Sequence, residues 1–255
     1  MNSALLAVAR FTLLEGRRGH LPALLFALLG AAAVLATFAA SLAITDSLAY
    51  RVVLYAGVVR FGLVLLVTLF VAASVAREFE DRMLDLTLSR PVSRAAWYGG
   101  RLAGFATLAV LGTVLAALPL CLGAPPMRVL AWGTTLAAEL VLVAAVSLAC
   151  AVTLRQVTAV VAVTLAFYLL ARAIDALVLM SHGPTVDPAS WITLVVASGV
   201  EGLALVIPPL GRFADSGWLM ADAPPPALAG LGFETACFLA LVVAVGLFDL
   251  YRAND

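Results

Sequence analysis

The chain has 255 residues, of which 64% are hydrophobic and only 12% are charged, and its formal net charge at pH 7 is zero. A soluble domain carries about a quarter charged residues, so the composition excludes an ordinary soluble protein and predicts a polytopic α-helical membrane protein. Every strongly basic residue is arginine. Without lysine the chain has no phosphate-binding P-loop and cannot hydrolyse ATP by that route. We expect no nucleic-acid partner.

The N-terminal residues 3–18 predict a short amphipathic helix on the membrane surface. Asn2 or Ser3 can cap this helix, and its arginines cluster on one side. The alternative is a longer first span with a frayed end.

Six apolar segments are each long enough to cross a bilayer: residues 22–44, 52–76, 102–122, 129–154, 157–180 and 228–250. Arg60 lies in the outer half of the second segment, where we expect its side chain to snorkel to the interface. Arg155 and Gln156 predict a tight turn between the fourth and fifth spans.

Residues 181–226 form a long polar and proline-rich region that contains an apolar island at 191–207. The island is short, carries Glu201 and ends at two prolines. We therefore expect an extracytoplasmic or re-entrant helix pair. A seventh crossing, which would place the C-terminus outside, is the alternative.

Arginines that flank the spans indicate the orientation of the chain, because cytoplasmic flanks are enriched in them. An N-terminus inside places ten arginines in the cytoplasm: Arg10, Arg17, Arg18, Arg77, Arg82, Arg90, Arg94, Arg101, Arg155 and Arg252. Five lie outside or near that interface: Arg51, Arg60, Arg128, Arg172 and Arg212. This excess predicts six spans with both termini cytoplasmic.

Residues 77–101 form the longest charged stretch between two spans. Read as a helix, its first part has Phe79, Met83 and Leu86 on one face and charged residues on the other: Glu78, Asp81, Arg82 and Asp85. Pro91 disfavours helical geometry at Arg90, and Ser93 can cap a second helix that continues into the third span. The stretch predicts a helical hairpin that projects into the cytoplasm. A merely solvated loop is the alternative.

The same stretch resembles the signature loop of type-2 ABC export permeases. The matching residues are Glu78 to Arg82, then Leu88-Ser89-Arg90-Pro91-Val92-Ser93-Arg94, then Gly100-Arg101-Leu102. The nearest branch serves copper-enzyme maturation, as does the nitrous-oxide reductase accessory permease. Two positions depart from the pattern: Arg82-Met83 stands where many members have Gly-Thr, and Arg101 replaces the commoner lysine.

The resemblance implies a non-catalytic permease subunit of an ATP-driven exporter in the bacterial inner membrane. It implies pairing with a second copy or a close paralogue and docking on a separate cytoplasmic ATPase, with a periplasmic accessory protein as a further candidate partner. ATP and Mg²⁺ would belong to the ATPase, so this chain is expected to hold no cofactor. The docking residues that we expect are Glu78, Glu80, Asp81, Arg82, Asp85, Arg90, Pro91, Ser93 and Arg94, with Glu15, Arg17 and Arg18 as helpers.

Charged residues inside the spans are a second group of candidates. Glu139 falls near the middle of the fourth span, where a charge costs at least ~2.5 kcal/mol, so it must face protein or water or be protonated. It is either a substrate or proton site or a polar contact between helices. Arg172 and Asp175 are three residues apart and are expected to pair with each other near the outer surface. Glu234 and Glu201 are candidates for lining an outer vestibule.

Two other functions stay open on the sequence. One is a proton-coupled secondary transporter that uses Glu139 and the Arg172–Asp175 pair, and the other is a non-transporting membrane anchor for an enzyme complex. We expect no metal site. Three cysteines, Cys121, Cys150 and Cys237, have no pair spacing and are expected to be apolar core residues, and His20 and His182 are expected at the interface.

Overall fold

The computed structural model describes residues 2–43, 46–80, 93–181, 191–220 and 228–252. These residues are largely helical, and no strand occurs among them. The long helices are α2 (Leu21–Leu42), α3 (Ser47–Glu80), α5 (Arg94–Ala117), α6 (Pro126–Leu154), α7 (Val157–Ser181) and α9 (Leu228–Arg252). The shorter elements are α1 (Asn2–Arg18), α8 (Trp191–Val206) and the 3₁₀ helices η1 (Leu118–Leu122), η2 (Leu210–Arg212) and η3 (Ser216–Leu219).

The six predicted spans are confirmed as helices that are long and apolar enough to cross a membrane. Their boundaries differ from the prediction mainly at α3, which begins at Ser47 and continues to Glu80, and at α5, which begins at Arg94. Both helices extend into the stretch assigned to the hairpin. Residues 81–92 lie outside the described residues, so the hairpin itself stays a prediction.

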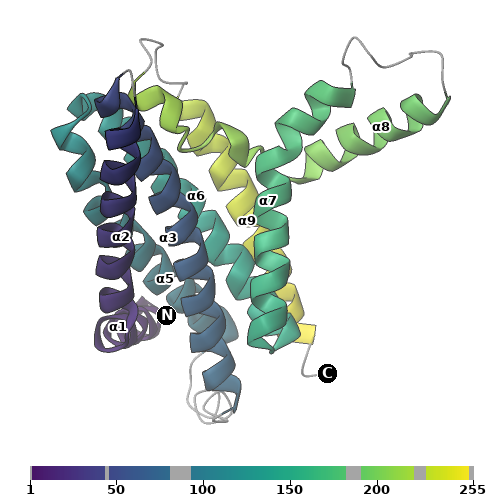
Figure 1. The fold of residues 1–255 in the computed structure, drawn as a ribbon. Helices are drawn as coiled ribbons and strands as arrows, with labels where there is room; N and C mark the ends of the chain where they lie inside the picture. The colour runs from purple at the N-terminus through teal and green to yellow at the C-terminus, as the bar shows by residue number, and fades with distance from the viewer. Residues whose placement is uncertain (1, 44–45, 81–92, 182–190, 221–227, 253–255) are drawn as a thin grey trace.

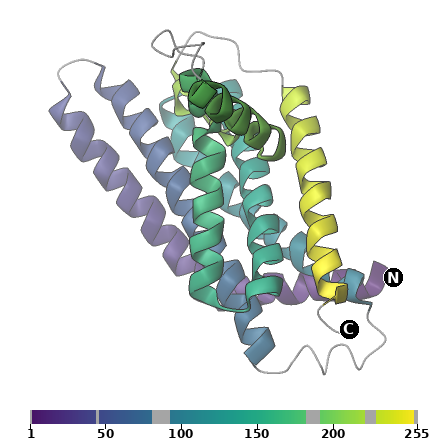
Figure 2. The same ribbon diagram turned by 90° about the vertical axis from the view of Figure 1, so that its right-hand side faces the viewer.

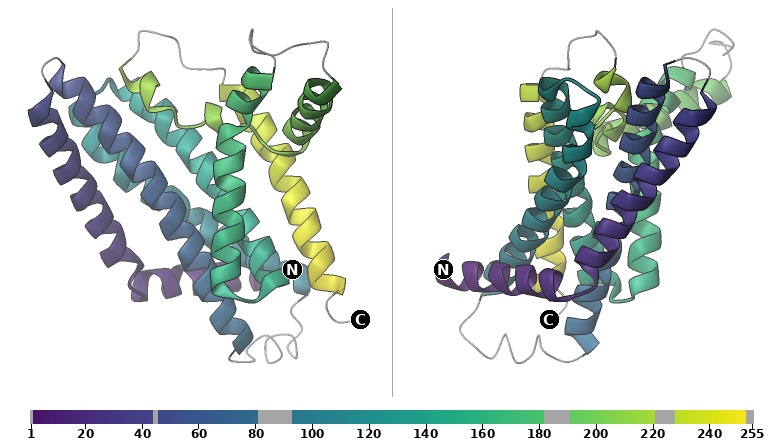
Figure 3. Two further views of the ribbon diagram at one scale, coloured as in Figure 1. Left: turned by 45° about the vertical axis from the view of Figure 1, so that its right-hand side comes forward. Right: turned by 60° about the vertical axis from the view of Figure 1, so that its left-hand side comes forward.

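The spans run up and down through one bundle, and α1 lies crosswise at one end of it (Figures 1 and 3). The last turns of α9 lie at the same end as α1 (Figure 2). The central helix is α6, which packs on α3, α5, α7 and α9. Which membrane face the α1 end occupies stays a prediction.

Helix ends follow their local sequence. Ser93 caps α5 as predicted, because its side chain accepts a hydrogen bond from the backbone N–H of Ala96 at 3.2 Å. Arg155 ends α6 in the left-handed conformation, with φ 53°, and Gln156 leads directly into α7. The tight turn predicted at these two residues is therefore confirmed.

The apolar island forms α8, and the chain bends by 63° between it and the segment 210–219. By length and composition this bent pair is a broken span or a re-entrant loop. Both parts lie at the end of the bundle opposite α1 (Figure 2). The apolar residues Leu210, Phe213 and Leu219 anchor the segment 210–219 in the core, since they expose at most 1% of their surface.

Two glycines let α1 approach α5 closely. A Cβ at Gly100 would lie 2.7 Å from Cβ of Val8, and a Cβ at Gly104 would lie 2.5 Å from Cβ of Thr12. Such distances are far below van der Waals contact, so any side chain there would push the helices apart. The Gly-x-x-x-Gly spacing thus holds α1 against the bundle.

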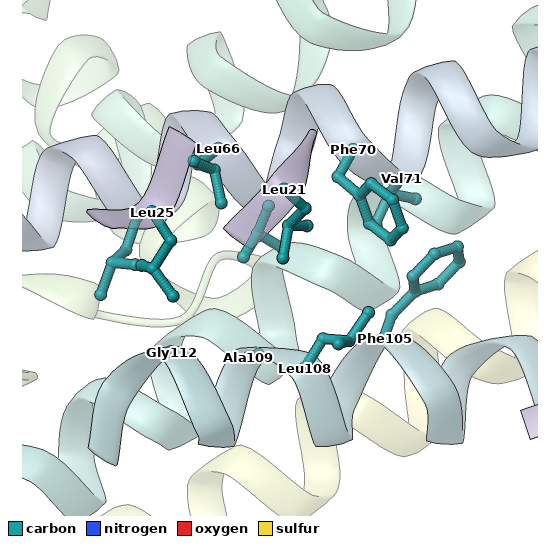
Figure 4. Close-up of a pocket in the computed structure, with 11 residues that line it drawn as sticks. Leu21, Leu25, Leu66, Phe70, Val71, Phe105, Leu108, Ala109 and Gly112 are labelled. Atoms are coloured by element: carbon teal, nitrogen blue, oxygen red, sulfur yellow. The ribbon is translucent and has the colours of Figure 1, made fainter. Parts of the chain in front are cut away.

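A small apolar cavity of about 20 Å³ lies between α2, α3 and α5 (Figure 4). All of its lining residues are apolar, including Leu25, Phe105 and Gly112. A Cβ at Gly112 would meet Cδ2 of Leu63 at 3.5 Å, an ordinary contact distance. The cavity is a packing gap and is too small to be a ligand site.

We therefore expect glycine-to-alanine substitutions at two positions of α5 to change the free energy of unfolding in opposite directions. Gly112→Ala should raise the free energy of unfolding by about 0.5–1 kcal/mol, because alanine favours a helix and fills space. Gly104→Ala should lower it by about 1–3 kcal/mol, because the clash with Thr12 outweighs the same helix gain. Thermal unfolding of both variants in one detergent measures the difference. Equal shifts would contradict the close α1–α5 contact.

Candidate functional site

The first candidate site surrounds Arg101, whose side chain is 1% exposed. Arg101 lies two turns into α5, next to α1 and the last turns of α3. Its guanidinium donates to Glu78 Oε2 through Nε at 2.9 Å and also through Nη2. Nη1 donates to Glu15 Oε2 at 2.8 Å and to Thr12 Oγ1 at 3.2 Å. One arginine therefore joins α1, α3 and α5; we call these groups the Arg101 cluster.

The two carboxylates of the Arg101 cluster have further partners. The indole Nε1 of Trp97 donates to Glu78 Oε1 at 2.9 Å, and the Ser74 hydroxyl donates to Glu15 Oε1 at 2.7 Å. Arg77 Nη2 lies 3.7 Å from the same Glu15 oxygen. The carboxylates thus form charge-assisted hydrogen bonds inside the protein, the kind that stabilise most strongly.

Glu15 and Glu78 were expected among the docking residues, and in the structure their carboxylates bond to Arg101 within the chain. Their contact with a partner stays a prediction. Both carboxylates point to Arg101, because a guanidinium buried among apolar side chains needs compensating charges nearby. A sequence signal for the burial of Arg101 was available. Gly100 and Gly104 lie on either side of Arg101, and this pair of glycines marks a close helix contact at the same level of α5.

The other predicted docking residues occupy different places. Arg17 and Arg18 are exposed at the end of α1. Arg94 Nη1 donates to the carbonyls of Leu250 and Tyr251 at 3.3 Å, so it ties the start of α5 to the end of α9. Asp81, Arg82, Asp85, Arg90 and Pro91 lie outside the described residues, as does the side chain of Glu80.

The second candidate site surrounds Glu139, which is completely buried at 0% exposure in α6. Its Oε1 accepts a hydrogen bond from the Tyr168 hydroxyl at 2.8 Å and forms an ion pair with Arg172 Nη1 at 3.4 Å. Arg172 also donates to the carbonyl of Leu210 at 3.2 Å. Glu139 thus joins α6 to α7 and, through Arg172, to η2.

The predicted pairing of Arg172 with Asp175 is wrong. Asp175 instead accepts from Arg212, at 3.2 Å to Nε and 3.3 Å to Nη2. The long side chain of Arg172 reaches α6, where the fully buried Glu139 needs a cation more than the half-exposed Asp175 does.

Arg60 does not snorkel to the interface as predicted, because it is 7% exposed and binds a backbone carbonyl in the core. Its Nη1 donates to the carbonyl of Ala214 at 2.7 Å, and Trp132 Nε1 donates to the same oxygen at 3.2 Å. The N–H of Ala214 donates to Thr135 at 3.3 Å. Side chains of α3 and α6 therefore hold the segment 210–219 against the spans.

A cleft of about 550 Å³ lies beside the Glu139 site, between α7, the segment 210–219 and the first turns of α9. Its charged lining residues are Arg172, Asp175, Arg212, Asp215 and Glu234. Glu234 therefore lines the cleft, whereas Glu201 on α8 is exposed and does not.

Within the described part of the chain, no group of three or more histidine, cysteine or acidic residues could hold a metal ion. All three cysteines are free thiols. Cys121 and Cys237 are exposed, not core residues as expected, and Cys150 is half-buried. An apolar side chain on a membrane helix can face lipid as well as protein, which the sequence alone does not distinguish.

The chain matches no family model and no curated protein sequence.

Proposed function

We propose that this chain is the permease subunit of an ATP-driven ABC exporter and that it transmits force from a separate cytoplasmic ATPase. The observation that carries the proposal is the Arg101 cluster, which joins α1 to the end of α3 and the start of α5. These two helices flank residues 81–92, whose sequence resembles the docking loop of the family. A push on that loop would therefore reach α1 and two spans together.

The charges of the Arg101 cluster suit mechanical transmission rather than chemistry. Arg101 has hydrogen bonds to two carboxylates, and Glu15 and Glu78 each have a second donor. A fully paired network of this kind keeps its members in a fixed mutual orientation. In this proposal α1 and the adjoining turns of α3 and α5 move as one body.

Asp81 and Asp85 remain the best candidates for contact with the ATPase, since Glu78 is used internally. We expect Asp81→Arg or Asp85→Arg to abolish co-purification of an ATP-hydrolysing subunit with a tagged chain from native membranes, because a like-charge contact replaces an attractive one. The measurement is ATPase activity per mole of purified chain, with each variant's amount in the membrane determined in parallel.

Glu201→Arg is the matched control for these charge reversals. Glu201 is exposed on α8, at the end of the bundle opposite α1, and the substitution changes the charge by the same amount. It should leave the ATPase bound. If no ATP-hydrolysing partner accompanies the unaltered chain, or the Asp81 and Asp85 variants retain it, the coupling proposal fails.

A proton-coupled secondary transporter is the second candidate, and the buried Glu139 beside the charged cleft favours it. A carboxylate at this depth, paired with Arg172 and Tyr168, is the type of group that carries protons in such transporters. The two candidates differ in their energy source. Conformational change driven by ATP through a bound partner supports the exporter, and change driven by a pH gradient in vesicles of the chain alone supports the alternative.

A further inference from the structure

The cleft beside Arg172 has the size of a small-molecule site. Its volume of about 550 Å³ falls within the range of roughly 300–1,000 Å³ that is typical of such sites. Its walls come from α7, the segment 210–219 and α9, which meet at the end of the bundle opposite α1 (Figure 3). The segment 210–219 is fixed by Arg60 and Trp132, so one wall of the cleft is preformed.

The charges around the cleft leave an excess of carboxylates. Both arginines of its lining are used, Arg172 by Glu139 and Arg212 by Asp175. Asp215 and Glu234 have no ion pair among the residues that the structure describes. Among the charged residues that line the cleft, two arginines (Arg172 and Arg212) stand against three carboxylates (Asp175, Asp215 and Glu234).

Glu234 is the carboxylate of the cleft with the least compensation. Its Oε2 is buried and accepts no hydrogen bond from the protein. A carboxylate oxygen in this situation costs free energy that a cationic group beside it would recover. Asp215 is partly engaged, since its Oδ1 accepts from the N–H of Gly217 at 2.9 Å.

Apolar and aromatic surface lies next to these carboxylates. Trp218 and Leu231 line the same cleft, and an indole ring attracts cations as well as apolar groups. Gly230 also lines it, and a Cβ built there would meet nothing within 4 Å. The first turn of α9 therefore leaves room for a bulky ligand.

We propose that this cleft binds a monovalent organic cation, with its charge between Asp215 and Glu234 and its apolar body against Trp218 and Leu231. The site requires no ATPase, so it goes beyond the proposed coupling function and would survive its failure. The chemistry excludes organic anions, which the same two carboxylates would repel.

Radiolabelled tetraphenylphosphonium is a suitable probe, because tetraphenylborate has nearly the same shape and the opposite charge. Binding is measured on the full chain in lipid nanodiscs, with empty nanodiscs subtracted. We expect saturable binding of the cation at one site and none of the anion. Glu234→Gln should weaken binding of the cation by about tenfold, because it removes the uncompensated charge.

A pair of glycine substitutions locates the site. Gly230→Leu should abolish binding by filling the cleft, whereas Gly232→Leu should leave it unchanged. Gly232 also has open space around a Cβ but does not line the cleft, so the two variants change α9 equally. Three results would overturn the proposal. They are an absence of saturable cation binding, equal binding of the anion, and equal binding by the two leucine variants. If Gly230→Leu does not fold, unchanged affinity in Glu234→Gln would overturn it.

Discussion

Arg101→Ala is expected to lower the free energy of unfolding by about 3–5 kcal/mol, because it leaves Glu78 and Glu15 without their cation in a buried place. Among the described side chains of α5, only that of Arg101 forms hydrogen bonds with both α1 and α3, and the substitution removes it. We expect α1 to detach from the bundle before the spans unfold. Thermal unfolding and protease accessibility of α1 in detergent measure the two effects.

Arg101→Lys is expected to recover less than half of that loss. The guanidinium donates in three directions, to Glu78, Glu15 and Thr12, and it lies between the rings of Phe11 and Phe105 at 5.7 and 5.5 Å. An ammonium group cannot reproduce this planar, forked arrangement. A full recovery would show that the charge alone matters and that the geometry of the Arg101 cluster does not.

Arg10→Ala provides the control for loss of an arginine near the same end. Arg10 is exposed on α1, so its removal should change the free energy of unfolding by no more than about 0.5 kcal/mol. A loss from Arg10→Ala as large as that from Arg101→Ala would indicate a general effect of charge at this end of the bundle.

The spans could be predicted from sequence because a run of about 20 apolar residues has few other stable structures. Helix ends could also be predicted where local residues decide the geometry, as at the cap Ser93 and the turn at Arg155. The packing of the segment 210–219 into the core could not be predicted from the sequence. It belongs to the polar and proline-rich region 181–226, which suggested an external loop. Yet Leu210, Phe213 and Leu219 are buried, and side chains of three spans donate to its carbonyls.

Partners of the charged residues were the least predictable part of both candidate sites. Local spacing favoured Arg172 with Asp175 and an outward role for Glu78. The observed partners lie far away in sequence, since Arg172 binds Glu139 and Glu15 binds Arg101. Helix packing decides which charges become buried, and buried charges then take the partners that compensate them best. A single sequence contains no direct record of that packing.

The second large effect is expected at Glu139 and Arg172, and the two single substitutions should differ. Arg172→Met should cost about 3–5 kcal/mol, because Glu139 is fully buried and keeps only the Tyr168 hydroxyl as a hydrogen-bond partner. Glu139→Leu should cost less, because Arg172 is 19% exposed and retains the carbonyl of Leu210. Chemical unfolding in detergent gives both values.

The double variant Glu139→Leu/Arg172→Met should be more stable than the sum of the single losses predicts, by about 1–3 kcal/mol, since neither charge is left alone. Arg212→Met is the matched control. It breaks the Asp175 pair, whose side chains are 59% and 34% exposed, and an exposed pair contributes only about 0–1 kcal/mol. Additive single losses would show that the Glu139–Arg172 contact does not hold α6 to α7, and the Tyr168 hydroxyl and the apolar packing would then account for that helix pair. A coupling of the expected size would mean that any separation of α7 from α6 at this level must first break the Glu139–Arg172 ion pair.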